Sequence, residues 1–366
     1  MGFEPEKLLR KGIETLDIYV PGRRAEEVGR EYGLTEVLKL ASNENANGPS
    51  PAALEAIQGV LKGLNRYPDG HAGVLRAALA ERLGVEEAQI FIGNGGDDVL
   101  SVLSRTFLND GDEVIIPQPT FSPYRHVSRV MGAKVVLSPL RDYRIDLDDI
   151  ASRASGRSKL IFLCSPNNPT GTILEKKALV SFLEALPENT LVLLDEAYGD
   201  FVDDPEWPDS LALIEQYPLI VLRSFSKIYG LAGLRVGYGI GNKELIGFMH
   251  RVREPFNVNQ LAQVAAVAAL GDEGFRESSI RMNREERQKY YLVFRELGIA
   301  FIESQANFIF INVRNGDAVT EALLKLGLIV RPGSAFGCPE WIRVTIGTPE
   351  ENTGLSAGLR NALSGA

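Results

Sequence analysis

Between residues 90 and 241 the chain alternates short apolar runs with segments of helix length, and this alternation limits the possible fold more than any other feature. The runs are IFIG, EVIIP, KVVLS, KLIFLCS, TLVLLDE, LIVLRSFS and VGYGIG. Several are rich in Val, Ile and Leu without polar alternation, as in strands that are buried on both faces. The sequence therefore predicts an α/β fold with a mainly parallel, doubly wound sheet.

The segments on either side of this alternation predict an N-terminal arm and a second, smaller unit. Residues 1–36 carry mixed charge and are expected to form the arm. From about residue 259 a long helical stretch leads to further strand-like and helical runs, namely ANFIFINV, DAVTEALLKLG, LIVRPG and WIRVTIG. We expect a large domain over residues 49–258 and a small α+β domain from residues 37–48 and 259–366.

Two helices near the start of the large domain can be predicted from local signals. Ser50 followed by Pro51 is typical of a helix N-terminus, with serine as the cap and proline in the first turn. Residues 74–85 have apolar side chains at helical spacing, and Gly84 is a plausible stop.

Composition excludes several classes of function. The chain has 366 residues and a net charge of −9, which disfavours nucleic acid or an anionic membrane as the main partner. Cys164 and Cys338 lie far apart, and the three histidines are scattered, so we expect no metal site and no Ser/His machinery. No signal peptide or membrane-spanning run is recognisable, so a cytoplasmic location is expected.

Polar, turn-rich segments follow five of the apolar runs. They are GNGGDD, PQPTFSPY, SPNNPTG, DEAY and SFSK. Because ligand sites in such sheets gather at the carboxyl ends of the strands, we expect these segments to form one site.

Part of this site has the chemistry of a phosphate cup. Ser224 and Ser226 offer hydroxyl groups, and Arg235 offers a fixed cation with a planar fork. GNGGDD opens a predicted helix, and the first N–H groups of a helix attract phosphate. The backbone groups expected to take part are those of Gly95, Gly96 and Asp97.

The other polar side chains suit an aromatic ring that carries an aldehyde. Asp195 could pair with a ring nitrogen, and Asn168 could donate to a ring oxygen. Tyr198 would lie close to Asp195, and Tyr124 could stack on the ring. Lys227 has an amine that can condense with the aldehyde and then serve as a base. The ligand that combines these groups with a phosphate is pyridoxal 5′-phosphate (PLP), whose ring takes up electrons when a substrate loses its α-proton.

Taken one at a time, most of these residues have an ordinary structural explanation. Asp195 could cap a helix, Arg235 could form a surface ion pair, and Asn168 before a proline is a common turn residue. Tyr124 and Tyr198 could be packing residues. Their joint occurrence in this order favours a shared site.

Nearly the whole chain, from about residue 19 to 352, resembles the fold-type I, aspartate-aminotransferase-like superfamily of PLP enzymes. Within it, the chain is most similar to the class II aminotransferases of the histidinol-phosphate type. The segments that carry the resemblance are SNENANGPSP, NRYPDG, GNGGDD, PTFSPY, SPNNPTGT, LLDEAY, SFSKIYGLAGLRVGY, LIVRPGSAFG and WIRVTIGTPEEN.

The resemblance implies a role for each matching residue. Lys227 would bond the cofactor aldehyde, Asp195 would pair with the ring nitrogen, and Tyr198 and Asn168 would bind the phenolic oxygen. Tyr124 would stack on the ring. The phosphate ligands would be Gly95, Gly96, Asp97, Ser224, Ser226 and Arg235.

The resemblance also implies substrate ligands and a partner. Arg343 would grip the α-carboxylate of the amino donor, and Arg331 is the candidate for a substrate phosphate. Tyr19 would close over the substrate, and Asn45 would contact it. Tyr67 would reach the cofactor of a neighbouring chain, which implies a homodimer with shared active sites.

Two positions depart from the family pattern. Serine is more usual where Gly96 stands, and glutamate where Asp98 stands. Losing a serine removes a hydroxyl but leaves the backbone N–H, so weaker or rearranged phosphate contacts are expected.

The resemblance implies exchange of an amino group between L-histidinol phosphate and 2-oxoglutarate, as in histidine biosynthesis. An aromatic amino acid aminotransferase and a threonine-phosphate decarboxylase-like enzyme share the fold and stay open as alternatives. A regulator that keeps the fold without the chemistry is disfavoured by the intact lysine, aspartate and arginine. A nicotinamide dehydrogenase is disfavoured because no GxGxxG opens a helix with an acidic residue about twenty positions later.

Overall fold

The computed structural model describes residues 4–10, 12–16, 18 and 22–364, and within them each of the seven apolar runs forms a strand of one sheet. The sheet order is β2-β8-β7-β6-β5-β3-β4, and only β8 runs antiparallel to its neighbours. The bounds are β2 Ile90–Gly93, β3 Glu113–Gln118, β4 Lys134–Pro139, β5 Ser158–Cys164, β6 Leu191–Asp195, β7 Leu219–Ser224 and β8 Gly237–Gly241. The predicted α/β fold with a mostly parallel sheet is confirmed.

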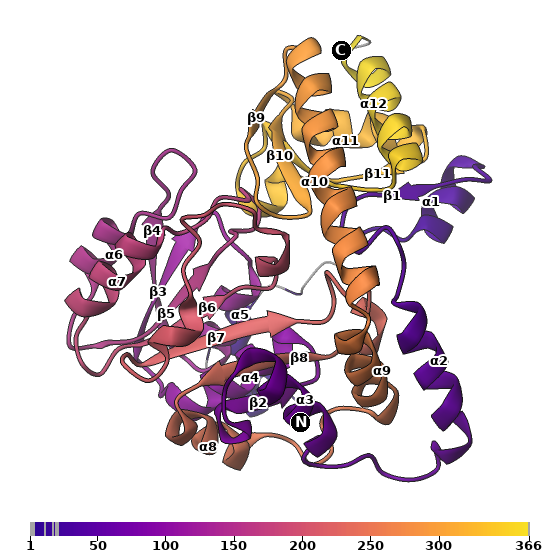
Figure 1. The fold of residues 1–366 in the computed structure, drawn as a ribbon. Coiled ribbons are helices and arrows are strands. Elements are labelled where there is room, and N and C mark those ends of the chain that lie inside the picture. The colour runs from indigo at the N-terminus through magenta and orange to yellow at the C-terminus, as the bar shows by residue number, and fades with distance from the viewer. Residues whose placement is uncertain (1–3, 11, 17, 19–21, 365–366) are drawn as a thin grey trace.

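Helices cover both faces of this sheet, as Figure 1 shows. One face packs on α4 (Gly96–Phe107), α5 (Pro123–Val130) and α8 (Lys243–Val252) through one apolar cluster. The other face packs on α3 (Gly73–Leu83), α6 (Leu147–Arg153), α7 (Lys176–Ala185) and α9 (Gln260–Gly271) through a second. Two buried faces explain why the strands lack polar alternation.

A smaller unit sits above this sheet in Figure 1. Its four-stranded sheet has the order β12-β13-β10-β9, with antiparallel neighbours. A two-stranded parallel pair joins β1 to β11. The strand bounds are β1 Leu38–Lys39, β9 Ala300–Ile302, β10 Phe308–Asn312, β11 Leu328–Ile329, β12 Arg331–Pro332 and β13 Trp341–Thr345. The helices are α10 (Glu273–Glu296), α11 (Gly316–Lys325) and α12 (Pro349–Ser364).

Two predicted helices begin and end close to where their local signals lie. Helix α2 spans Pro51–Val60, and the Ser50 hydroxyl accepts a hydrogen bond from the Ala53 N–H. Helix α3 ends at Leu83, and Gly84 follows with a φ of +68°. Glycine adopts this left-handed conformation without steric cost, which is why it ends the helix here.

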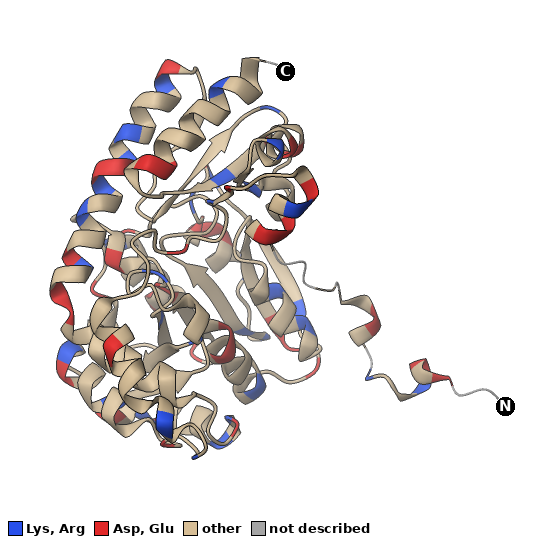
Figure 2. Cartoon of the chain, turned by 90° about the vertical axis from the view of Figure 1, so that its right-hand side faces the viewer, with Lys and Arg blue, Asp and Glu red and all other residues tan. Residues whose placement is uncertain are grey.

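The structure divides two segments differently from the sequence-based expectation. The long helical stretch from residue 259 is two helices, and Asp272 caps the second by accepting from the Phe275 N–H. The expected arm contains helix α1 (Ala25–Tyr32), whose Val28 is buried against Leu324 and Ile329 of the small unit. The first described residues, 4–10 and 12–15, extend away from the body in Figure 2, whereas Leu16 and Ile18 line a cavity together with Asp97 and Arg331.

No helix among the described residues is both long and apolar enough to cross a membrane.

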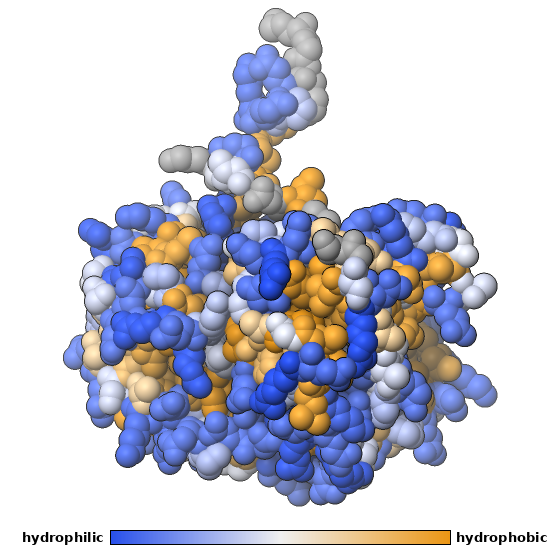
Figure 3. Space-filling model, turned by 90° about the horizontal axis from the view of Figure 1, so that it is seen from above, coloured by the Kyte–Doolittle hydropathy of each residue, from blue (hydrophilic) through white to orange (hydrophobic). Residues whose placement is uncertain are grey.

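Basic and acidic residues are interspersed over the face drawn in Figure 2. Seen from above, hydrophobic residues gather across the middle of the surface, and hydrophilic residues surround them (Figure 3).

Candidate active site

Lys227 lies in the loop that follows β7, and its amine points at the chain segment that follows β1. The Nζ atom donates a hydrogen bond to the Ser42 carbonyl over 3.1 Å and lies 5.5 Å from the centre of the Tyr198 ring. Burial, assisted by the positive charge of Arg343, lowers the pKa of Lys227 to about 8. The neutral amine is therefore far more populated near neutral pH than in an ordinary lysine.

Asp195 ends β6 and is 5% exposed. Its Oδ2 accepts a hydrogen bond of 2.6 Å from the Tyr124 hydroxyl, and its Oδ1 accepts one of 2.9 Å from the Ala197 N–H. Burial raises the pKa of Asp195 to about 6, although both hydrogen bonds oppose the shift. The site thus holds a buried carboxylate that a cationic group would stabilise.

The position of Tyr124 disagrees with its predicted stacking role. Its ring is fully buried and stacks on Phe162, with ring centres 4.9 Å apart and planes 8° apart. A ring without an exposed face cannot stack on a ligand, so Tyr124 instead holds Asp195 through its hydroxyl. Phe121 lies edge-on to Tyr124 and is partly exposed in the neighbouring cavity, which makes it the better candidate for a ring contact. The motif PTFSPY contained both residues, but its letters do not reveal which one faces the ligand.

Tyr198 and Asn168 are both buried, and each is held by a hydrogen bond from another side chain. Asn43 Nδ2 donates to the Tyr198 hydroxyl over 2.9 Å, and Arg343 Nη1 donates to Asn168 Oδ1 over 2.5 Å. Burial raises the pKa of Tyr198, so its hydroxyl stays protonated. Asn43 was missed by sequence reasoning, although it belongs to the motif SNENANG.

The predicted phosphate cup forms where α4 begins. Gly95 caps this helix with a φ of +85°, and a Cβ there would lie 2.6 Å from Arg235 Nη2. The same guanidinium pairs with the Asp97 carboxylate over 3.1 Å. At the end of β7, which β8 separates from β2 in the sheet, the Ser224 hydroxyl accepts from the Ser226 N–H over 3.0 Å. Gly96 is the first residue of α4, so the structure brings every predicted cup residue to these two strand ends.

Two arginines of the small unit face each other across neighbouring strands. Arg331 of β12 pairs in register with Arg343 of β13, so both side chains project from the same face of the sheet. Arg343 is 5% exposed and also donates to the Ala41 carbonyl over 2.5 Å. Arg331 is partly exposed and, together with Asp97 and Phe121, lines a cavity of about 720 Å³. This cavity adjoins the phosphate cup, because Asp97 belongs to both.

Two further predicted residues make contacts that differ from those expected, and a third is not described. Tyr67 is 82% exposed and stacks on Phe256, with ring centres 4.7 Å apart. Asn45 donates to the Ile228 carbonyl over 2.8 Å and accepts from the Asn47 N–H, contacts that favour a structural role over the predicted substrate contact. Tyr19 lies outside the described residues.

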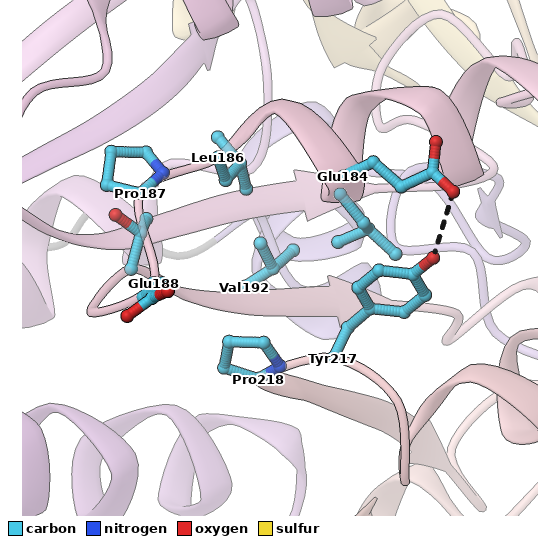
Figure 4. Close-up of a pocket in the computed structure, with 9 residues that line it drawn as sticks. Glu184, Leu186, Pro187, Glu188, Val192, Tyr217 and Pro218 are labelled. Atoms are coloured by element: carbon cyan, nitrogen blue, oxygen red, sulfur yellow. Dashed lines mark hydrogen bonds between the residues drawn. The ribbon is translucent and has the colours of Figure 1, made fainter.

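Further cavities among the described residues lie at the amino-terminal ends of strands of the large sheet and between α10 and α12. A smaller cavity of about 210 Å³ lies among residues that precede β6 and β7, including Glu184, Pro187 and Tyr217 (Figure 4). This cavity therefore lies at the amino-terminal ends of the strands, whereas Lys227 lies at their carboxyl ends. No cluster of His, Cys, Asp and Glu among the described residues could hold a metal ion.

Comparisons with known proteins agree with this geometry. Residues 35–358 match the sequence model of the family described as aminotransferase class I and II. A histidinol-phosphate aminotransferase from Moorella thermoacetica is 47% identical over 97% of this chain and 93% of its own length. One from Brevibacillus brevis is 45% identical over 98% and 99%. The solved histidinol-phosphate aminotransferase from Sinorhizobium meliloti, in complex with pyridoxal-5′-phosphate, is 27% identical, covers 98% of each chain and superposes with a TM-score of 0.91.

Proposed function

Because the chain belongs to the aminotransferase class I and II family, we propose that it exchanges an amino group between L-histidinol phosphate and 2-oxoglutarate with the help of PLP. The single observation that supports this proposal is that the Lys227 amine, the buried Asp195 carboxylate and the Arg235 guanidinium lie near the ends of β6 and β7, close enough for the charge of Lys227 to favour ionisation of Asp195 and for that of Arg235 to disfavour ionisation of Lys227. Relatives that are 44–47% identical over nearly the whole chain and bear the name of this activity support it.

The residues present fit PLP. The positive φ of Gly95 and the guanidinium that lies against it leave a cradle that a side chain would fill, at a helix N-terminus suited to phosphate. Asp195 is buried, accepts hydrogen bonds only from neutral groups, and has a raised pKa. These properties are expected of a carboxylate whose cationic partner is a ring nitrogen. When bound, PLP supplies an aldehyde for an amine and a protonated ring that takes up the electrons of the departing α-proton.

Each of the chain's own site residues would then have a separate role. Lys227, with its lowered pKa, can hold or release a proton near neutral pH and so serve as the base for the α-carbon. Asp195 keeps the ring nitrogen protonated, while Tyr198 and Asn168 offer hydrogen bonds to the phenolic oxygen. Substrate groups would meet the cations of the small unit, namely Arg343 for a carboxylate and Arg331 for a phosphate.

A homodimer is part of the proposal. The exposure of Tyr67, at 82%, supports a contact with another copy of the chain, as do the exposed apolar side chains of Leu8 and Ile18 in the described part of the arm. A cytoplasmic location also belongs to the proposal, and the two free cysteines, Cys164 and Cys338, support it.

A half-reaction panel tests the function. The purified protein is loaded with PLP and mixed separately with glutamate, histidinol phosphate, phenylalanine and phosphothreonine while the visible cofactor band is followed. Loss of the band with glutamate and histidinol phosphate is expected. A response to phenylalanine without histidinol phosphate would favour an aromatic aminotransferase, and carbon dioxide release from phosphothreonine would favour a decarboxylase.

Variants assign the roles of the three cations. Lys227→Ala should lower turnover by more than about 10⁴-fold, because the amine is both the attachment point and the base. Lys62→Ala, on the surface, is the matched control. Arg343→Ala should mainly impair glutamate, and Arg331→Ala should impair phosphorylated substrates more than others. Near-normal turnover without Lys227 would overturn the assignment.

A further inference from the structure

Asn43 occupies an unusual place in the turn between β1 and α2. It is 1% exposed, and its φ of +57° puts it in the left-handed region. Asparagine tolerates this conformation better than most residues with a side chain. A buried polar residue in such a conformation is kept in place by its surroundings, so its contacts identify what it does.

Four polar groups of Asn43 are hydrogen-bonded. Its N–H donates to the Thr345 hydroxyl over 3.0 Å, and its backbone carbonyl accepts from Asn307 Nδ2 over 3.0 Å. Its Oδ1 accepts from the Thr345 hydroxyl over 3.1 Å, and its Nδ2 donates to the Tyr198 hydroxyl over 2.9 Å. The residue therefore joins the end of β6 to the small unit.

These contacts determine which way the amide points. Thr345 is 3% exposed, and its single hydroxyl proton is donated to Asn43 Oδ1. A flipped amide would take that acceptor away and leave a buried donor without this partner, which costs free energy. The amide nitrogen thus faces Tyr198. Because the Tyr198 oxygen accepts this hydrogen bond, its own proton is left to be donated in another direction.

Strand β13 holds both predicted ligands of the phenolic oxygen. Arg343 and Thr345 are two residues apart, so their side chains project from the same face of the strand. Arg343 binds Asn168 directly, and Thr345 binds Tyr198 through Asn43. The Lys227 amine lies 5.5 Å from the Tyr198 ring, so this hydroxyl belongs to the same site.

We propose that Asn43 is a positioning residue that makes the Tyr198 hydroxyl a hydrogen-bond donor to the phenolic oxygen of PLP, and that Thr345 of β13 sets its orientation. The proposal rests on the proposed function. Asn43 does not act on the substrate itself. It acts through Tyr198 by occupying an acceptor site on the hydroxyl oxygen.

Two substitutions at Asn43 test this. Asn43→Asp keeps the shape and tolerates the left-handed conformation, but it replaces the donor by an acceptor, so the Tyr198 proton turns toward the new carboxylate. Asn43→Gly keeps the backbone and its bonds to Thr345 and Asn307 but removes the amide. Tyr198→Phe shows the effect of losing the donor. Asn47→Asp is the matched control, because it adds a charge to the same turn and contacts Ser279 instead.

The readout is the pH midpoint of the visible band of the PLP-loaded protein, together with the PLP dissociation constant. A hydrogen bond to the phenolic oxygen stabilises its anionic form, so losing it should raise the midpoint, by about one pH unit for Tyr198→Phe. Asn43→Asp should raise it by a similar amount and Asn43→Gly by less, while Asn47→Asp should leave it in place.

Combination with Tyr198→Phe separates positioning from other effects. In that background Asn43→Asp should change the midpoint little, since the hydroxyl it acts through is gone. The proposal would be overturned if Asn43→Asp shifted the midpoint equally in wild type and in Tyr198→Phe. It would also be overturned if Tyr198→Phe shifted the midpoint while neither Asn43 variant did. If Asn43→Asp does not fold, the same comparison is made with Asn43→Gly, alone and combined with Tyr198→Phe. A wild-type protein without a visible band would instead overturn the proposed function.

Discussion

At the scale of single residues, burial is the main cause of the ionisation of the two central groups, and the positive charge of Arg343 adds to it at Lys227. Removal from water disfavours the charged form, so it lowers the pKa of Lys227 to about 8 and raises that of Asp195 to about 6. Both shifts reflect the absence of a strong opposite charge from the described contacts. A ligand with a carbonyl for the amine and a cation for the carboxylate would relieve both costs.

The raised pKa of Asp195 predicts a pH-dependent stability of the cofactor-free protein. The folded state holds this proton up to about pH 6, whereas the unfolded chain releases it near pH 3.8. The contribution is therefore present below pH 3.8 and is lost as the pH rises through 6. Wild type should lose stability relative to Asp195→Asn between pH 4 and 6, by on the order of 2–3 kcal/mol. Thermal unfolding of both proteins across this range measures the difference, and parallel curves would contradict the prediction.

At the scale of elements, local patterns predicted well where burial or a cap decides the structure. The seven apolar runs became the seven strands of the large sheet, and Ser50 caps α2 as expected. The break at Asp272 was missed because residues on both sides suit a helix, although Gly271 followed by Asp272 is a recognisable helix stop and N-cap. The pairing of β1 with β11 joins residues 290 positions apart, for example Leu38 and Leu328, which no local pattern reveals.

The N-terminus of α4 supports a prediction about the phosphate cup. Gly95→Ala should raise the PLP dissociation constant by at least about 10-fold, because its Cβ would displace the Arg235 guanidinium from a charge-assisted contact. Gly84→Ala is the matched control: its φ is also positive, at +68°, but a Cβ there meets nothing within 4 Å. The backbone cost is roughly 1–2 kcal/mol for Gly84→Ala, where the residue is left-handed helical, and on the order of 1–3 kcal/mol for Gly95→Ala, where a ψ of 173° suits almost only glycine. Titration with PLP distinguishes them, and equal affinities would show that the cup does not depend on this contact.

At the scale of the whole molecule, helix α10 joins the two units. It begins beside the large sheet and ends in the small unit, as Figure 1 shows. Arg276 pairs with Asp200, and Arg287 pairs with Asp203, each over 2.9 Å. Both aspartates follow β6, the strand that ends in Asp195, so the helix is tied to the segment next to the site. Arg287 is 2% exposed, and its Nε and Nη1 find no acceptor among the described residues.

This arrangement predicts that the Asp203–Arg287 pair contributes more to stability than a surface pair does. Asp203→Ala should lower the free energy of unfolding by about 2 kcal/mol, since it leaves a buried guanidinium uncompensated while Asp203 itself is partly exposed. Glu303→Ala removes an exposed ion pair with Arg295 and should cost less than about 1 kcal/mol. Denaturant unfolding of the cofactor-free variants compares the two, and equal losses would contradict the prediction.

The site shows where sequence reasoning stops. The order of motifs was enough to predict the cup and the roles of Lys227 and Asp195 as hypotheses, because each residue ends or follows a recognisable strand. The contacts of Asn43 with Tyr198 and of Arg343 with Asn168 join residues 155 and 175 positions apart, so only the folded chain brings them together. The same limit applies to the predicted ring contact, because the letters of PTFSPY do not show that Tyr124 is buried against Phe162 while Phe121 is partly exposed.

The sequence by itself determined the layered α/β architecture and the family, because apolar periodicity and ordered motifs are local properties that each segment carries alone. Tertiary structure decided which polar atoms meet, which ring faces the cavity, and how Lys227 and Asp195 ionise. These depend on distance and on exclusion of water, and both arise only when distant segments pack together.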